Sequence, residues 1–481
     1  MKELRKVKIV CTIGPASEDY ETLKSLVESG MNVMRLNFSH GTHDEHAEKM
    51  KTMRRINQEL GSNVAIMLDT KGPEIRTHTF EYGGVTLMKG TIVRVAMNEV
   101  VGTAERFSVT YSDLINDVKV GGKILVDDGN VTLTIKELDF KNKEIVCYVE
   151  NDAYVKDRRG INVPDVNLGM EFISTRDRSD IEFGCEQQVD FIAASFVRRA
   201  SDVLDIRKIL EEKGCPDIKI ISKIENLEGV KNLDEIIKVS DGLMVARGDL
   251  GVEVPVYEVP VIQKEMINKC LVANVPVIVA TQMLESMQKN PRPTRAEVND
   301  VATAVLSGAD AIMLSGETAS GKYPIEAVKM MDQIGRRMEK EMNYEQFLST
   351  IRKNSKHDIT SSIALSVVDA ANQLDISCII TPTSTGLTAK KLSNFRPPVP
   401  IIAVTMEDRI MRSLALSWGV HVCKNELCQT TDEVIEDSVN LASHNFAIEK
   451  GELVIVTCNM PLTSPITHAN MMKIQQIEKW K

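Results

Sequence analysis

Polar and charged residues recur where apolar, β-branched runs of the sequence end. Buried charges need partners. Because so many of the runs end in polar residues, one shared site is favoured over isolated structural residues. The runs end, in chain order, in Arg35, Asn37 and Ser39; Asp69 and Thr70; Lys223 and Glu225; Arg247, Gly248 and Asp249; Thr281 and Gln282; Ser315, Gly316 and Glu317.

The types of these side chains limit the chemistry. The carboxylates of Glu225 and Asp249, beside Lys223 and an arginine, suit a hard divalent cation such as Mg²⁺ that holds an anionic substrate. A spacing of two places Lys223 and Glu225 on the same face of a strand. A second cluster has neutral oxygens and one carboxylate, which would fit a monovalent cation; it consists of Asn37, Ser39, Asp69 and Thr70.

Other catalytic patterns are missing from the sequence. No cluster of His and Cys has the spacing of a zinc site. His40 follows Ser39, but no nucleophile–base–acid trio can be identified. The phosphate-binding pattern G-x-x-x-x-G-K-[ST] does not occur, so this is not a P-loop enzyme.

Eight apolar runs alternate with segments of helical period, which is typical of buried parallel strands. Eight such units predict a TIM (β/α)8 barrel, with the polar run ends gathered at its C-terminal rim. The runs are Val7–Gly14, Asn32–Ser39, Ala65–Thr70, Phe191–Val197, Ile218–Glu225, Gly242–Gly248, Val275–Gln282 and Ala311–Glu317.

Two further regions complete the predicted organisation. Short strands and turns fill residues 73–159, which predicts an all-β domain inserted after the third barrel strand and placed as a lid. The polar stretch STIRKNSKHDITSS predicts a linker, and 346–481 then read as a C-terminal α/β domain. Residues 1–72 and 160–345 would form the barrel, and no further domain is expected at either end.

In the predicted C-terminal domain, a strand that ends at Thr381 is followed by a helix start rich in hydroxyl groups. Hydroxyls and backbone N–H groups at a helix N-terminus can bind phosphate, and ligands commonly bind after the strands of such sheets. An ordinary helix cap remains the alternative. The candidate phosphate ligands are Thr383, Ser384, Thr385, Gly386 and Thr388.

Bulk composition agrees with an intracellular enzyme. The 481 residues carry a net charge of −10, which argues against nucleic acid as a partner. The nine cysteines lack C-x-x-C spacing and are expected to be reduced thiols. No signal-peptide or membrane-spanning run is visible, so a cytoplasmic location without membrane association is expected.

Long motifs of the sequence resemble those of the pyruvate kinase family. The similar stretches are KIVCTIGPAS, NVMRLNFSHG, LDTKGPEIRT, LVDDG, ISKIENLEGV, DGLMVARGDLGVEVP, ATQMLESM, PRPTRAEVNDVA and MLSGETASGKYP. They follow the family's order and cover essentially the whole chain. The resemblance implies a barrel, a β lid and a regulatory α/β domain in a homotetramer. It also implies phosphoryl transfer from phosphoenolpyruvate to ADP, giving ATP and pyruvate in the last step of glycolysis.

The resemblance also implies roles for single residues. Lys223 would steady the transferring phosphoryl group, and Glu225 and Asp249 would bind Mg²⁺ or Mn²⁺. The remaining roles are implied for Arg35 on the substrate phosphate; Gly248, Asp249 and Thr281 on the substrate, with Thr281 near the proton-delivery side; Asn37, Ser39, Asp69 and Thr70 as K⁺ ligands; and Asn37, Arg76 and Arg159 at the nucleotide. Glu74 in GPEIR is the family's mark of K⁺ dependence.

Three departures from the family pattern stand out. Arg158-Arg159 replaces the usual Lys-Lys, and Thr175-Arg176-Asp177 replaces E-K-D. Arginine and lysine are not equivalent at a phosphate. The segment PLTSPITHAN, 461–470, replaces a Gly/Ser-rich turn that often frames an effector pocket, so the phosphorylated effector is left unidentified.

Two other functions remain open at this level. A Mg²⁺-dependent lyase acting on a pyruvate enolate could use the same Lys, Glu and Asp without a nucleotide. The lid with Arg76 and Arg159 would be superfluous there. A catalytically inactive barrel that serves as a binding module would be expected to have lost Lys223 or Glu225, and both are present.

Overall fold

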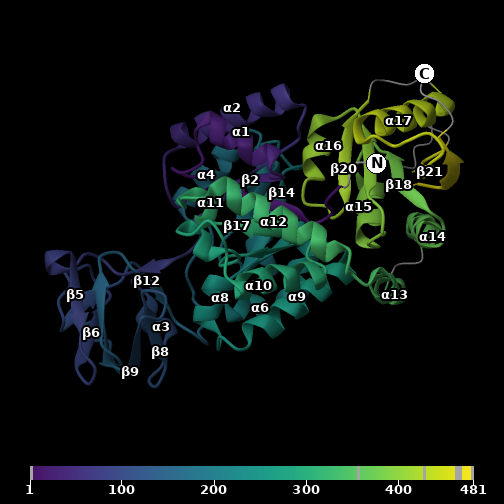
Figure 1. The fold of residues 1–481 in the computed structure, drawn as a ribbon. Helices are drawn as coiled ribbons and strands as arrows, with labels where there is room; N and C mark the ends of the chain where they lie inside the picture. The colour runs from purple at the N-terminus through teal and green to yellow at the C-terminus, as the bar shows by residue number, and fades with distance from the viewer. Residues whose placement is uncertain (1–3, 355–357, 426–429, 461–468, 478–481) are drawn as a thin grey trace.

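The computed structural model describes residues 4–354, 358–425, 430–460 and 469–477. Three bodies lie in a row, with a small β domain and a C-terminal α/β domain on opposite sides of a central barrel (Figure 1). None of the helices in these ranges is long and apolar enough to cross a membrane.

The central body is a closed barrel of eight parallel strands, in the order β1-β17-β16-β15-β14-β13-β3-β2. Each of the eight predicted runs contains one of these strands, so the predicted TIM barrel is confirmed. The strands are β1 (Lys8–Thr12), β2 (Val33–Asn37), β3 (Ala65–Asp69), β13 (Phe191–Ala194), β14 (Lys219–Ile224), β15 (Gly242–Ala246), β16 (Val277–Ala280) and β17 (Ala311–Leu314).

The barrel strands are apolar at nearly every position because both of their faces are buried. One face fills the barrel interior, where Val10, Met67 and Ile221 pack together. The other packs against surrounding helices, which are α1 (Tyr20–Glu28), α2 (His43–Leu60), α4 (Thr175–Glu186), α5 (Ala200–Glu212), α6 (Leu227–Lys231), α7 (Leu233–Val239), α8 (Arg247–Glu253), α9 (Val259–Ala273), α10 (Arg295–Leu306), α11 (Gly316–Ala319) and α12 (Pro324–Glu339), with a short 3-10 turn η2 (Glu285–Gln288).

The lid is an all-β domain inserted between β3 and β13, as predicted. A seven-stranded sheet in the order β4-β12-β8-β9-β10-β6-β7 and a two-stranded sheet enclose its own apolar core. The elements are β4 (Ile75–Arg76), η1 (Glu81–Gly83), β5 (Gly84–Leu87), β6 (Ile92–Ala96), β7 (Arg106–Ser108), α3 (Leu114–Asp117), β8 (Lys123–Val126), β9 (Val131–Asp139), β10 (Glu144–Val149), β11 (Ala153–Lys156) and β12 (Gly160–Asn162).

The C-terminal domain is a five-stranded sheet in the order β20-β19-β18-β21-β22. Its last strand, β22, is antiparallel to β21 and was not predicted. The predicted linker was wrong in part, because helix α13 runs through its first half and packs Leu348 and Ile351 into the domain core. The elements are α13 (Tyr344–Asn354), α14 (Ile359–Gln373), β18 (Ile376–Pro382), α15 (Leu387–Asn394), β19 (Ile401–Thr405), α16 (Asp408–Ser413), β20 (Val420–Lys424), α17 (Thr431–Phe446), β21 (Leu453–Cys458) and β22 (Met471–Gln476).

Candidate active site

The ends of β3, β13 and β14 bring a buried lysine into contact with two carboxylates. Lys223 Nζ lies 3.0 Å from Asp69 Oδ1, 3.1 Å from Glu225 Oε1 and 2.7 Å from Ser195 Oγ. Lys223 is 8% exposed and both carboxylate residues are almost fully buried. An ammonium group held in this way is a fixed positive charge at the C-terminal rim of the barrel.

Asp69 is the shared partner of two cations. Its Oδ2 accepts a hydrogen bond from Arg35 Nε at 2.6 Å, and Arg35 also donates to Thr12 Oγ1 at 2.8 Å. Burial alone would raise the pKa of Asp69, but the charges of Arg35 and Lys223 hold it below its ordinary value. Burial opposes the charge of Lys223, and its pKa is nevertheless raised, by Asp69 and Glu225. The rim therefore carries the Lys223 ammonium beside the guanidinium of Arg35.

The pKa values of Glu225 and Asp249 are shifted in the opposite direction to that of Asp69. Burial raises the pKa of Glu225 to about 7 despite the nearby Lys223, and burial also raises the pKa of Asp249. The charge of Asp249 is a further cause that raises the pKa of Glu225. Glu225 Oε2 accepts a hydrogen bond from the Phe196 N–H at 2.6 Å. Buried carboxylates that resist ionisation are the donors that a divalent cation would stabilise.

A metal at this place would need ligands from outside the protein. Within the described ranges, no group of three or more His, Cys, Asp or Glu is arranged as a metal centre. Glu225 and Asp249 offer two carboxylates, and Mg²⁺ characteristically combines one or two carboxylates with water and substrate oxygens. The residues present therefore fit a divalent cation that binds together with an anionic substrate.

The segments after β15 and β16 are joined across the rim. The Gly248 N–H donates to Thr281 Oγ1 at 2.9 Å, and Arg247 donates to the Thr281 carbonyl and to both oxygens of Asp300. Thr281 and Gln282 both have positive φ, 67° and 55°, which is unfavourable for residues with a side chain. Strained backbone of this kind persists where the surrounding contacts fix it, often at functional sites.

The proposed monovalent-cation residues lie next to this network. Asn37 and Asp69 are direct partners in the register of β2 and β3. Asn37 Oδ1 accepts from the Ser39 N–H at 3.0 Å, and Thr70 Oγ1 accepts from the Ser195 N–H at 3.1 Å. The structure thus places these residues at one edge of the rim, where Asp69 already pairs with Arg35 and Lys223.

The two arginines expected at a nucleotide lie on or directly before the strands that join the lid to the barrel. Arg76 in β4 pairs with Glu74 at 2.8 Å and donates to the Arg158 carbonyl. Arg159 precedes β12, and its Nε lies 3.4 Å from Asp127 Oδ1. The barrel residue Asn37 has no described hydrogen bond to either arginine within the residues that the structure covers.

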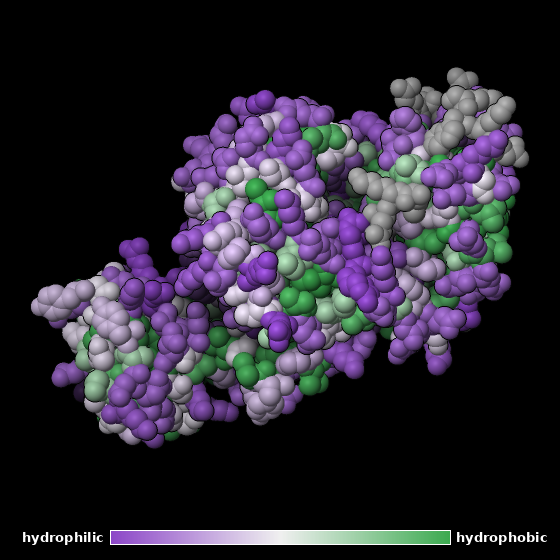
Figure 2. Space-filling model, in the orientation of Figure 1, coloured by the Kyte–Doolittle hydropathy of each residue, from purple (hydrophilic) through white to green (hydrophobic). Residues whose placement is uncertain are grey.

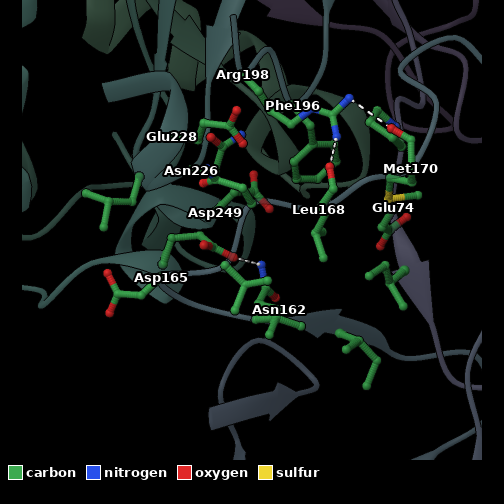
Figure 3. Close-up of a pocket in the computed structure, with 18 of the residues that line it drawn as sticks. Glu74, Asn162, Asp165, Leu168, Met170, Phe196, Arg198, Asn226, Glu228 and Asp249 are labelled. Carbon is green, nitrogen blue, oxygen red and sulfur yellow. Dashed lines mark hydrogen bonds between the residues drawn. The ribbon is translucent and has the colours of Figure 1, made fainter. Parts of the chain in front are cut away.

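A cleft of about 90 Å³ separates the lid from the barrel, and the lid forms a separate lobe of the surface (Figure 2). Arg198 extends along the cleft wall and donates to the carbonyls of Leu168 and Met170 (Figure 3). Most charged groups of the wall are carboxylates, namely Glu74, Asp128, Asp165, Glu228, Asp249 and Glu253. A polyphosphate could bind in this acidic cleft only with a cation between its phosphates and the carboxylates. This agrees with the divalent cation inferred above.

Two predicted groups lie outside this cluster. Glu317 is fully buried and accepts hydrogen bonds from the backbone N–H groups of Leu284 and Ser315, which is a structural role. The effector candidates lie in the C-terminal domain, between β18 and α15, except Thr388, which is the second residue of α15. There, Thr383 Oγ1 accepts from the N–H of Gly386, the residue before α15, and Thr385 Oγ1 accepts from the N–H of Leu387. Residues 461–468 of the departing segment lie outside the described residues.

Sequence reasoning missed the residues that β13 contributes. Ser195 and Phe196 follow this strand directly and contact Lys223 and Glu225. A polar residue at the end of an apolar run was the signal used for the other strands. The same signal was present in the run Phe191–Val197, where Ser195 is the polar residue.

Comparison with known proteins gives one consistent answer. The family model described as the pyruvate kinase barrel domain matches residues 4–328, and that of the pyruvate kinase alpha/beta domain matches residues 361–475. Pyruvate kinases of Geobacillus stearothermophilus and Bacillus licheniformis are each 51% identical to this chain, and the matches cover 98% of it and 80% of each relative. A pyruvate kinase structure from Cryptosporidium parvum is 40% identical and aligns with a TM-score of 0.93, covering 98% of this chain and 96% of that one.

Proposed function

The chain belongs to the pyruvate kinase family, and we propose that the cluster of Lys223, Asp69 and Glu225 is the place where it carries out phosphoryl transfer. The reaction moves the phosphoryl group of phosphoenolpyruvate to ADP, giving ATP and pyruvate. The family depends in general on a divalent metal ion and on potassium. The family relation leaves no need for the lyase or the inactive barrel as alternatives.

The observation that carries this assignment is the buried ammonium of Lys223 among three oxygen partners. Phosphoryl transfer needs positioning and charge stabilisation more than covalent catalysis. A fixed ammonium close to two carboxylates can stabilise charge on the transferring group and on the enolate oxygen without reorganising. A coupled assay of ADP-dependent pyruvate formation from phosphoenolpyruvate tests the activity, and K223M should abolish it.

Glu225 and Asp249 would hold Mg²⁺ or Mn²⁺, which supplies the positive charge that grips phosphoenolpyruvate. E225Q and D249N keep the shape of each side chain and remove its charge, so each should lower kcat by at least about 100-fold. E339Q is the matched control, because Glu339 is also buried with a raised pKa but binds backbone N–H groups at the other end of the barrel. Near-normal activity of E225Q or D249N in Mg²⁺ would contradict the ligand set.

Arg35, Gly248, Asp249 and Thr281 would contact phosphoenolpyruvate. Arg35 is fixed by Asp69 and Thr12, which leaves its guanidinium available to the substrate phosphate at the rim. The Gly248 N–H is directed at Thr281 Oγ1, so a substrate carboxylate could replace that hydroxyl as acceptor. Thr281 would then lie on the side from which a proton reaches the enolate carbon.

The oxygens of Asn37, Ser39, Asp69 and Thr70 would bind K⁺. Glu74 supports this assignment, since a carboxylate at that position leaves the positive charge to be supplied by an ion. Activity should rise severalfold when Na⁺ is replaced by K⁺ at constant ionic strength. Full activity with tetramethylammonium as the only monovalent cation would exclude this role.

Asn37, Arg76 and Arg159 would bind the nucleotide beneath the lid. Both arginines lie at the strands that lead into the lid, so lid closure would carry them toward the barrel rim. R76M and R159M should raise the Michaelis constant for ADP more than that for phosphoenolpyruvate. The reverse pattern would place the arginines at the other substrate.

The loop Thr383–Thr388 would bind the phosphate of an effector. Ser384 and Thr385 are exposed at the start of α15, where backbone N–H groups favour an anion. T385E places a negative charge there and should abolish activation by sugar phosphates or nucleoside monophosphates while basal turnover persists. T350E, at an exposed position of helix α13, is the control. Activation that survives in T385E would leave the loop as a cap only.

The oligomeric state and the cellular location are proposed from the family relation. We propose a homotetramer, which sedimentation of the full chain would test. A cytoplasmic location and domain boundaries near residues 72, 159 and 345 are retained from the sequence. Limited proteolysis, with cleavage first near residues 73 and 159, would support the lid boundaries.

A further inference from the structure

Ser195 lies at the end of β13 and contacts three groups of the catalytic cluster. Its Oγ is 2.7 Å from Lys223 Nζ, 2.6 Å from the carbonyl oxygen of Thr70 and 3.2 Å from Asp69 Oδ1. Ser195 is 2% exposed, so water does not compete for these contacts. The hydroxyl therefore bridges Lys223 and the backbone that follows β3.

The protons of this bridge can be assigned. The Lys223 ammonium only donates, so Ser195 Oγ accepts from it. The single hydroxyl proton then goes to the Thr70 carbonyl, the nearer of the two remaining acceptors. A second N–H group of Lys223 donates to Asp69, and Glu225 Oε1 lies within ion-pair distance of the ammonium at 3.1 Å. Ser195 is the neutral group among these three partners.

The backbone around Ser195 holds the hydroxyl in place. The Ser195 N–H donates to Thr70 Oγ1, which ties the residue to β3 a second time. Gly72 has φ of 72° and packs so closely that a Cβ there would lie 2.8 Å from the Cβ of Ser195. Phe196 has φ of 56° and directs its N–H to Glu225. Ser195 and the strained Phe196 therefore position Lys223 and Glu225, respectively, through these contacts.

We propose that Ser195 is a positioning residue for phosphoryl transfer, whose hydroxyl anchors the Lys223 ammonium to the backbone after β3. This inference rests on the proposed role of Lys223. If Glu225 is engaged by a divalent cation, its contact with Lys223 is the one that weakens. Lys223 then keeps Asp69 and Ser195 as anchors and has one N–H free for the phosphoryl group. A neutral anchor orients the ammonium without cancelling its charge.

The decisive variant is S195A, which removes the anchor and leaves Asp69 in place. A hydrogen bond to a charged group has a strength that corresponds to about a tenfold to hundredfold effect on rate. We expect kcat to fall by that factor, while the Michaelis constant for phosphoenolpyruvate changes by less than about threefold, since the contact acts mainly in the transition state.

The matched control is S222A. Ser222 precedes Lys223 in β14, is fully buried, and its hydroxyl is bonded to Ser240 Oγ at 2.6 Å, away from the cluster. It removes a hydroxyl of the same barrel, so it should lower the thermal midpoint about as much as S195A and leave kcat and the Michaelis constant for phosphoenolpyruvate unchanged. A merely structural role of Ser195 would make the two variants alike in all three measurements.

K223M, measured in parallel, separates the failure of this inference from failure of the proposed site. If K223M is inactive and S195A has normal kcat, Ser195 is not a positioning residue and the inference is wrong. If K223M retains phosphoryl transfer, the role of Lys223 is wrong, and the inference falls with it. The double variant S195A/K223M should be no slower than K223M, since Ser195 acts through Lys223.

Discussion

The lid and the C-terminal domain meet opposite ends of the same barrel, and the two junctions are built differently. The lid is joined at the C-terminal rim through β4 and β12, the strands on either side of the inserted domain. The C-terminal domain packs against the opposite end, where the barrel strands begin. There, the Lys8 ammonium at the start of β1 donates to the carbonyl of Val420.

The C-terminal junction contains buried apolar side chains from both sides. The segment between α16 and β20 places Leu416 in the cluster that fills the barrel interior, together with Val10 and Ile221. Trp418 of the same segment is fully buried in the barrel's outer core. This domain therefore closes the floor of the barrel with its own side chains.

Buried ion pairs reinforce that floor. Arg396 is 2% exposed and lies 2.9 Å from Asp310, which precedes β17. Arg412 of α16 lies 2.8 Å from Asp190, which precedes β13. Burial raises the pKa values of both aspartates, and the arginines counteract that effect. A displaced C-terminal domain would take the arginine away from each carboxylate and leave it the backbone N–H donor of the barrel, Val277 for Asp310 and Ile66 for Asp190.

The lid junction is polar and open by contrast. Asn162 of β12 donates to Glu253 of α8 at 2.8 Å, across the acidic cleft described above. Burial raises the pKa of Glu253, and the hydrogen bond from Asn162 counteracts this in part. A domain held by two strands and polar contacts can move at little cost, whereas the C-terminal domain can shift only by repacking the barrel floor. The difference suits the roles proposed above, a lid over the nucleotide and a C-terminal domain through which an effector would act on the barrel.

The largest effect is expected from R396M, which breaks a buried ion pair of the C-terminal junction. Removing one partner leaves Asp310 buried without compensation and should cost about 3–5 kcal/mol of unfolding free energy. Urea unfolding measures this loss. The control is R409M, which removes the exposed pair of Arg409 with Asp217 across the same junction. R409M should cost about 0–1 kcal/mol. Equal losses would mean that the buried pair adds nothing specific to the junction.

L416A tests the apolar part of the same junction. Truncating a buried leucine should cost about 2–5 kcal/mol, because the barrel interior cannot collapse around the cavity. L204A is the control, since Leu204 is 51% exposed on α5. A loss below about 1 kcal/mol for L416A would show that Leu416 does not help to hold the two domains together.

Lys8 gives the junction a pH dependence. The pKa of Lys8 is lowered to about 7, mainly by burial and also by the charge of Arg5, while Glu339 opposes the shift. In the unfolded chain a lysine has a pKa of about 10.4. The unfolded chain therefore binds more protons between these values, and stability should rise with pH by up to about 1.4 kcal/mol per unit. K8M should flatten this rise in a series of thermal midpoints between about pH 7 and pH 10. Parallel curves for both proteins would contradict the buried-lysine explanation.

The smallest change in stability is expected from N162A at the lid junction. One hydrogen bond is lost, so unfolding free energy should fall by about 1 kcal/mol or less. The Michaelis constant for ADP should nevertheless rise severalfold, because the lid loses its contact with α8. N142A, at an exposed turn of the lid, is the control and should leave that constant unchanged. A large stability loss with unchanged nucleotide binding would reverse the comparison between the two junctions.

The sequence alone predicted the barrel because its signals are local. Runs such as Phe191–Val197 are apolar throughout, as required of strands buried on both faces, and their polar ends marked the rim. The types of Lys223, Glu225 and Asp249 were sufficient to predict a divalent cation with an anionic substrate. Helix α13 was misread because its polar surface resembles a linker, while Leu348 and Ile351 find their partners only in the folded domain.

Only the tertiary structure decided which groups touch. Ser195 looks like an ordinary strand-end serine, and its contact with Lys223 depends on β13 lying beside β14 in the closed barrel. Leu416 enters the barrel from a segment more than a hundred residues beyond the last barrel strand, at Leu314. Residue type and spacing determine the chemistry available to a chain, because they are local properties. Partners far apart in sequence, and the pKa values that burial and neighbours set, arise only when the strands close around a common interior.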